Sequence, residues 1–397
     1  MDINEVTLEK LEENPYPIYA ELRKSNPIVQ LPGIGGEWFV TSWDACSKIG
    51  ALSGLGSLRG GHPSQIEFFG GDNILTMQGP KHTSLRAGID VVLRPKHVKE
   101  YIEQSALSVI QEYVARIKPR GEAELVSELF EPISVRVVGN RLGLTDIDDE
   151  TLQRWFKTLS GGLSHFNIDD QHAAEKAART KESIDSYLKD AVAKLQQNPD
   201  GSMLSHIVHS GLPEGAPPRT FDEVITSIRV IILGGFQEPG TAISNTFFGL
   251  LTNPNQYVEL VLEPEKYAPL ALNEGMRWIA PIGTAERTAL EDIEIDGIVI
   301  PAKSHITLVM ASANRDSSRY ENADAFDMNR GAQTAAIFGY GEHYCAGNFL
   351  AKNLSTAVII EVAKALPNLR LKEDAQPRAT GHLFHSVNAL EAEWDIS

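Results

Sequence analysis

The sequence is poor in cysteine, in basic charge and in long apolar runs. It holds two cysteines, Cys46 and Cys345, which exclude a disulfide framework and a four-cysteine zinc or iron–sulfur site. No apolar run approaches the roughly 18 residues that cross a bilayer, and residues 1–5 show no basic or apolar leader. From these absences we expect a cytoplasmic protein.

Acidic residues outnumber basic residues by 53 to 36, which gives a formal net charge of −17. Because such a surface repels phosphate backbones and anionic headgroups, we expect neither a nucleic-acid partner nor a membrane partner. Apolar residues make up 42% of the 397 residues, which excludes a disordered or fibrous chain.

Most of the chain has helical periodicity, with apolar residues three and four positions apart and charged residues between them. Short β-branched or alternating segments lie at 38–41, 293–295, 298–300 and 305–309, and Asp296-Gly297 is a hairpin signal. No strand–glycine loop–helix unit of a nucleotide domain is present. We therefore predict one mainly helical domain over residues 1–397 with a minor β portion. The expected helices span 98–118, 148–160, 172–197, 221–250, 266–279 and 347–365.

The most informative stretch is the glycine-punctuated loop 338–347, which brings Cys345 to the start of an apolar helix. Backbone N–H groups and the positive helix end would favour a thiolate there. Three interpretations follow from the residues alone: a buried structural cysteine, a nucleophile activated by His343, or a thiolate ligand of haem iron.

The loop resembles the haem-binding signature of the cytochrome P450 superfamily, Phe-x-x-Gly-x-His-x-Cys-x-Gly. Phe338, Gly341, His343, Cys345 and Gly347 fill its defining positions. The resemblance implies a haem b cofactor with Cys345 as the axial metal ligand, Phe338 and Gly347 beside the haem, and O2 as co-substrate. It also implies the cytochrome P450 fold.

Further elements resemble the superfamily in the right order. Glu274 and Arg277 match its Glu-x-x-Arg element, and Arg330 would complete a buried structural network with them. For the haem propionates, the family pattern selects four partners, which are His82, Arg86, Arg287 and His343.

The helix at 221–250 carries the expected oxygen site. Pro239 lacks an N–H, so the carbonyl of Gly235 loses its helical partner, and Gly234 and Gly235 remove side-chain bulk. We expect a locally opened helix with room for dioxygen and water. The alternative is that the helix stops here and restarts.

The superfamily usually has an acid followed by threonine after this glycine pair, whereas this chain has Gln237 and Glu238. We hypothesise that Glu238 delivers protons during oxygen activation and that Gln237 positions it. Gly235 belongs to the same predicted catalytic group.

The string 237–240, Gln-Glu-Pro-Gly, resembles bacterial aromatic O-demethylases that act on guaiacol-type lignin monomers. The resemblance implies O-demethylation of guaiacol or ring-substituted guaiacols to catechols and formaldehyde. One expected aromatic position of that pocket falls on Leu163, so we expect a pocket of altered shape. The other implied substrate residues are Phe69, Leu75, Val230, Gly234, Ile282 and Phe384.

The resemblance also implies a separate NAD(P)H-dependent reductase carrying FAD and a [2Fe–2S] cluster. It would dock on the Cys345 side, where Arg94, Lys96 and Lys99 form a candidate basic patch. Other functions stay open: C–H hydroxylation of a terpene, fatty acid or macrolide, a non-catalytic haem sensor, or a cysteine hydrolase without haem.

Overall fold

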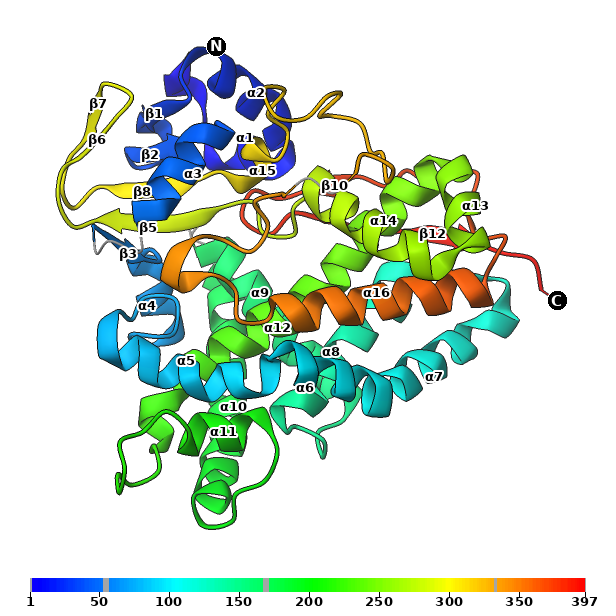
Figure 1. Ribbon diagram of the computed structural model, residues 1–397, viewed down its shortest axis with the longest axis horizontal. Helices are drawn as coiled ribbons and strands as arrows, with labels where there is room; N and C mark the ends of the chain where they lie inside the picture. Colours follow the sequence, from blue (N-terminus) through cyan, green and yellow to red (C-terminus); the bar gives the residue numbers. More distant parts are fainter. Residues whose placement is uncertain (1, 53–56, 167–170, 332–333, 397) are drawn as a thin grey trace.

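The computed structural model describes residues 2–52, 57–166, 171–331 and 334–396. It is a single, mainly helical domain with small β-sheets, as the sequence predicts. Figure 1 shows the largest sheet and the N-terminal helices at one end of the molecule, with the remaining helices forming the bulk. Among the described residues, no helix has both the length and the apolar character needed to cross a membrane.

The central element is α12 (Phe221–Thr252), a 32-residue helix that passes through the helical bulk. A capping box fixes its start, because Thr220 and Glu223 satisfy each other's backbone N–H groups. Its neighbours α8, α14 and α16 pack along its length. The burial of most of α12 makes it the axis of the main hydrophobic core.

The helices before and after α12 follow in chain order. They are α1 (Leu8–Glu13), α2 (Pro15–Ser25), α3 (Trp43–Leu52), α4 (Pro63–Phe69), α5 (Gly79–Leu93), α6 (Pro95–Tyr101), α7 (Leu107–Ile117), α8 (Glu131–Leu142), α9 (Asp149–Phe166), α10 (Gln171–Gln197), α11 (Met203–His209), α13 (Pro254–Leu262), α14 (Pro264–Trp278), α15 (Met310–Ala313) and α16 (Asn348–Ala365). Two π-helical turns, η4 (Ile102–Ala106) and η6 (Val126–Phe130), precede α7 and α8.

The largest sheet has the strand order β1-β2-β8-β5-β3, and only the pair β2 and β8 is parallel. Its strands are β1 (Ile28–Leu31), β2 (Glu37–Val40), β3 (Leu58–Gly60), β5 (Ala285–Ala289) and β8 (His305–Leu308). The smaller sheets comprise β4 (Glu122–Glu124), β6 (Ile293–Ile295), β7 (Ile298–Ile300), β9 (Arg370–Leu371), β10 (Ala379–Thr380), β11 (Ser386–Val387) and β12 (Glu391–Glu393).

The predicted hairpin is confirmed: β6 pairs with β7, and Asp296 and Gly297 both have positive φ, at 49° and 80°. The helix expected at 98–118 is present, but it begins at Pro95 and passes through the π-turn η4.

The alternative expectation about α12 is wrong, because the helix does not stop at Pro239 and stays continuous to Thr252. The hydroxyl of Ser134 on α8 donates to the Phe236 carbonyl over 2.7 Å. Packing also supports this stretch, since a Cβ on Gly240 would lie 3.2 Å from the backbone of Phe130 and Glu131.

Candidate active site

A cavity of about 370 Å³ lies between α12, the loop that carries Cys345 and the strand β5. Its lining is largely apolar, and the volume falls in the range of small-molecule sites, roughly 300–1,000 Å³. Most residues that the sequence assigned to haem, catalysis or substrate line this one cavity. They are Phe69, Leu75, Arg86, Leu163, Val230, Gly234, Gly235, Glu238, Ile282, Arg287, Phe338, His343, Cys345, Gly347 and Phe384.

The cysteine loop folds back on itself before α16. The N–H of Cys345 donates to the Phe338 carbonyl over 2.9 Å, and the side chain of Asn348 donates to the Cys345 carbonyl over 2.8 Å. Gly339 and Gly341 have φ of 74° and 65°, which side chains rarely adopt, so the glycines are required by the turn. The turn thereby places Cys345 in the lining of the cavity.

The thiol of Cys345 is not activated by the protein alone. Burial raises its pKa to about 11, although hydrogen bonds from the N–H groups of Gly347 and Asn348 act in the opposite direction. Among the described residues, no hydrogen bond joins the ring of His343 to Cys345, and Nε2 of His343 lies 3.6 Å from the Glu342 carboxylate instead. The arrangement therefore disfavours a cysteine nucleophile with His343 as its base.

Two histidines meet at the edge of the cavity. The rings of His82, on α5, and His343 lie 4.7 Å apart, and both side chains are buried. His82 does not line the cavity but packs behind His343. Burial lowers the pKa of both imidazoles, that of His343 to about 4. A Cβ on Gly60 would lie 2.7 Å from the His343 ring, so this glycine lets the ring approach β3.

Two arginines flank this edge. Arg86 on α5 donates to the Tyr344 carbonyl over 3.0 Å and pairs with Asp90, which ties the helix to the cysteine loop. Arg287 on β5 is 5% exposed and donates to the Tyr340 carbonyl over 3.2 Å. Burial lowers the pKa of Arg287 to about 10, against the opposite effects of Tyr340, Glu286 and Glu342, so the guanidinium stays charged at neutral pH.

On α12, Glu238 faces the cavity and Gln237 does not. Burial raises the pKa of Glu238 to about 8, and its Oε1 has no hydrogen-bond partner among the described residues. A Cβ on Gly234 would meet nothing within 4 Å, whereas one on Gly235 would lie 3.1 Å from Val138. Gly234 therefore opens space in the cavity, while Gly235 serves the packing of α12 on α8.

All seven predicted substrate residues line the cavity, Leu163 among them. The rings of Phe68 and Phe69, at the end of α4, lie edge to face at 5.1 Å. Phe68 packs on α9, where a Cβ on Gly162 would lie 3.2 Å from its ring. Phe69 instead lines the cavity, and so does Phe384, which forms a β-bridge with Ile282.

The family model for cytochrome P450 matches residues 59–372 of the chain. The chain belongs to the cytochrome P450 family. It is 26% identical over 381 residues to 6-deoxyerythronolide B hydroxylase of Saccharopolyspora erythraea, covering 91% of this chain and 90% of that one. It is 25% identical over 367 residues to vitamin D(3) 25-hydroxylase of Pseudonocardia autotrophica, covering 90% and 88%.

Solved structures agree in fold. P450BioI, crystallised with an acyl carrier protein ligated to hexadec-9Z-enoic acid, superposes with a TM-score of 0.86 at 24% identity, covering 98% of this chain and 99% of that one. The protein is accordingly a P450 monooxygenase that uses haem-thiolate iron and O2, as the cysteine loop predicts.

The described residues fit a haem. Cys345, which is half-buried, lines one wall of the cavity. At the edge, the Nε2 atom of His82 is buried without a hydrogen-bond partner among the described residues, Nε2 of His343 lies 3.6 Å from the Glu342 carboxylate, and Arg287 is buried close by. A buried donor and a buried cation match the needs of carboxylates such as propionates. The assignment of His82, Arg86, Arg287 and His343 to the propionates stays a prediction.

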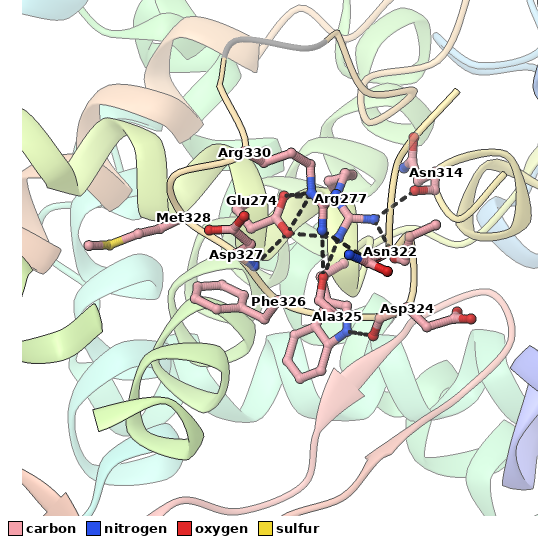
Figure 2. Close-up of polar contacts among 12 residues, drawn as sticks. Glu274, Arg277, Asn314, Asn322, Asp324, Ala325, Phe326, Asp327, Met328 and Arg330 are labelled. Atoms are coloured by element: carbon pink, nitrogen blue, oxygen red, sulfur yellow. Dashed lines mark hydrogen bonds and ion pairs between the residues drawn. The ribbon is translucent and has the colours of Figure 1, made fainter. Parts of the chain in front are cut away.

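The predicted network beneath the cysteine loop is confirmed in its contacts, and Figure 2 shows how it converges on one carboxylate. Glu274 pairs with Arg277 at 2.7 Å and with Arg330 at 3.1 Å, and all three side chains are less than 10% exposed. Arg277 also donates to the carbonyls of Asn314 and Ala323. The network ties α14 to the segment before the cysteine loop.

Sequence reasoning missed the polar residues that line the cavity from the β5 side, namely Gln65, Thr284 and Glu286. The side-chain amide of Gln65 donates to Glu286 over 3.3 Å. Burial, with Glu37 nearby, raises the pKa of Glu286 to about 7. The position before Arg287 was the available signal, since an acid next to a buried arginine indicates a charged environment.

The predicted basic patch lies on and before α6, which packs against α16. Lys96 is 3.9 Å from Glu100 and Lys99 is 3.8 Å from Glu103, one helical turn away in each case. These pairs reduce the net positive charge of the patch, and only Arg94 adds a cation without such an i,i+4 pair among the described residues.

Proposed function

We propose that this P450 removes the methyl group from small methoxylated aromatics, guaiacol or its ring-substituted relatives. The reaction consumes a methoxyarene, O2, two electrons and two protons, and yields a catechol-type phenol, formaldehyde and water. One observation carries the proposal: all seven residues that the resemblance assigns to a phenolic pocket line the cavity that Cys345 also lines.

The chain's own residues supply position and protons. When bound, haem with a cysteine thiolate ligand supplies oxygen activation. Phe69 and Phe384 offer aromatic walls to a flat ring, and Leu75, Val230 and Ile282 offer aliphatic ones. A ring held in this way presents its methoxy carbon in a fixed place, which decides which C–H bond reacts.

Glu238 is placed to give protons. Because burial holds its pKa at about 8, the carboxyl is mostly protonated at neutral pH and lies in the cavity wall on α12. Gly234 leaves room beside it for a small molecule such as water. Gln237 does not line the cavity, so the positioning role assigned to it stays a hypothesis that the geometry does not favour.

Bacterial members of the family take their electrons from separate redox proteins, such as a ferredoxin or a reductase. For this chain we propose an NAD(P)H-dependent reductase with FAD and a [2Fe–2S] cluster, which docks beside α6 and α16. Exposed Tyr344 and Phe349 flank Cys345 and add an aromatic component to that face.

The test is formaldehyde release from a panel of methoxylated aromatics with NADH and a reconstituted reductase. We expect formaldehyde in proportion to NADH oxidised for at least one guaiacol. The competing function is C–H hydroxylation of another small apolar substrate, which the named hydroxylases among the relatives favour. Hydroxylated fatty acid or terpene products without formaldehyde from any methoxyarene would establish that competitor.

A further inference from the structure

The substrate wall formed by Phe69 rests on a very short helix. α4 has seven residues and ends at Phe69, followed by Gly70 in the left-handed region at φ 86°. Isolated helices shorter than about 12–15 residues are marginal in water, so the position of α4 depends on its tertiary contacts. Its last two residues are Phe68 and Phe69, and backbone carbonyls at a helix C-terminus take donors from outside the helix.

Cations from two other helices satisfy these carbonyls. Nη1 of Arg229, on α12, donates to the Phe69 carbonyl over 2.6 Å. Nζ of Lys181, on α10, donates to the Phe68 carbonyl over 2.7 Å and lies 4.7 Å from the centre of the Phe68 ring. Positive charge at a helix C-terminus is favourable, and here it comes with hydrogen bonds.

Arg229 is itself held in place. Its Nε and Nη2 atoms both donate to the carboxylate of Asp185, on α10, in a two-pronged pair. The side chains of Arg229 and Asp185 are 11% and 33% exposed. Such planar pairing leaves Nη1 in one direction, toward Phe69. A Cβ on Gly70 would lie 3.0 Å from Nη1, so the glycine allows the close approach.

Arg229 does not line the cavity, although Val230, the next residue, does. Any influence of Arg229 on a bound ligand must therefore pass through a neighbour. The direct route is the Phe69 carbonyl, because the ring of the same residue lines the cavity.

We infer that Arg229 is a positioning residue that sets the width of the substrate pocket by holding the Phe69 carbonyl. With Asp185 it fixes the end of α4, so that the Phe69 ring admits flat rings of limited size. The inference deepens the proposed function, because it treats the Phe69 wall as a substrate wall.

The experiment measures cavity width with azoles, which bind to haem iron whatever the natural substrate is. Imidazole, 4-phenylimidazole and a 4-biphenyl imidazole are titrated into the haem-loaded enzyme, and the Soret shift gives each Kd. For R229Q we expect an unchanged imidazole Kd and a shift of the phenyl-to-biphenyl Kd ratio by about fivefold toward the larger ligand. The side chain of R229K can donate to one acceptor, so its phenyl-to-biphenyl Kd ratio should lie between those of the wild type and R229Q.

A matched control is available in Arg136. It pairs with Asp149 and donates to the Ile147 carbonyl over 2.8 Å, and its side chain is 14% exposed against 37% for Asp149. Neither Arg136 nor these two partners line the cavity. R136Q should lower the thermal midpoint about as much as R229Q and leave the Kd ratio unchanged.

Equal Kd ratios for R229Q, R136Q and the wild type would overturn the inference, and so would equal shifts in both variants. Should R229Q not retain haem, the single variants D185N and R229K carry the same comparison. D185N keeps the Arg229 guanidinium but frees it from its fixed direction. Failure of the proposed function would appear separately, as no formaldehyde from the wild type.

Discussion

The pH dependence of turnover tests the role of Glu238 most directly. Burial raises the pKa of this carboxyl from 4.5 to about 8, so the protonated fraction is about 0.9 at pH 7 and about 0.1 at pH 9. If the protonated form gives the proton, turnover should fall roughly tenfold between these pH values, with an apparent pKa near 8.

Glu238→Gln removes the titrating group and keeps the shape. We expect turnover to fall about 100-fold at pH 7, which is near the low end of general-acid effects because water can replace the acid in part. The turnover of this variant should no longer decrease above pH 8. Hydrogen peroxide formed per NADH oxidised should rise. Glu238→Asp is the control, since it keeps an acid in the same wall and should keep the alkaline fall.

The assay follows formaldehyde, hydrogen peroxide and NADH together, and the reductase is checked alone at each pH. Wild-type coupling in Glu238→Gln, or an unchanged fall of its turnover above pH 8, would refute the assignment. The variant should not be less stable than the wild type. A raised folded pKa means that the wild-type protein loses stability as the pH rises from 4.5 through 8, and glutamine carries no such charge.

Three further outcomes follow from buried groups. Glu274→Gln leaves two buried arginines poorly paired and should cost about 3–5 kcal/mol, measured by denaturant unfolding with haem content as a second readout. Burial lowers the pKa of His382 to about 4 and of His385 to about 3. The free energy of unfolding should therefore be highest above pH 6.5 and decrease below it by about 1.4 kcal/mol per pH unit for each histidine. An unfolding free energy that stays constant down to pH 5 would contradict this. Gly60→Ala places a methyl 2.7 Å from the His343 ring and 2.3 Å from a backbone oxygen, and should reduce haem retention while Gly234→Ala, which faces open space, does not.

The chemistry of the cysteine loop could be predicted because it is local in sequence. Within ten residues, glycines set the turn and the sulfur follows at a fixed offset, so no distant contact is needed to recognise it. The Glu274–Arg277 pair is likewise one helical turn apart. Arg330 could be assigned only through the resemblance, since the pattern of the residues does not reveal a contact across 56 positions.

Several helices escaped the periodicity analysis although the sequence marks their starts. Proline stands in the first turn of α2, α5, α8 and α13, where its missing N–H has no consequence. Some of these helices are short or buried on more than one face, as with Ile133, Val135, Val137 and Val138 on α8, so their apolar residues show no clean stripe. Proline positions would have located them.

The missed polar lining has a different cause. Glu286 pairs across β5 and β8 with Thr307, and its neighbour Gln65 comes from α4. The cavity wall therefore joins segments more than 200 positions apart, and a strand of five residues gives no sequence signal of which face it turns to a ligand. His82 shows the same limit, because its ring meets His343 but lies behind it.

The thiol of Cys345 shows how burial can outweigh a local signal. The sequence predicts a thiolate favoured by the helix start, and the N–H groups of Gly347 and Asn348 do donate to the sulfur. Yet the pKa rises to about 11, because the effect of burial outweighs that of the donors. With its pKa raised in this way, the Cys345 thiol is mostly neutral at neutral pH, and coordination to haem iron would favour its thiolate form.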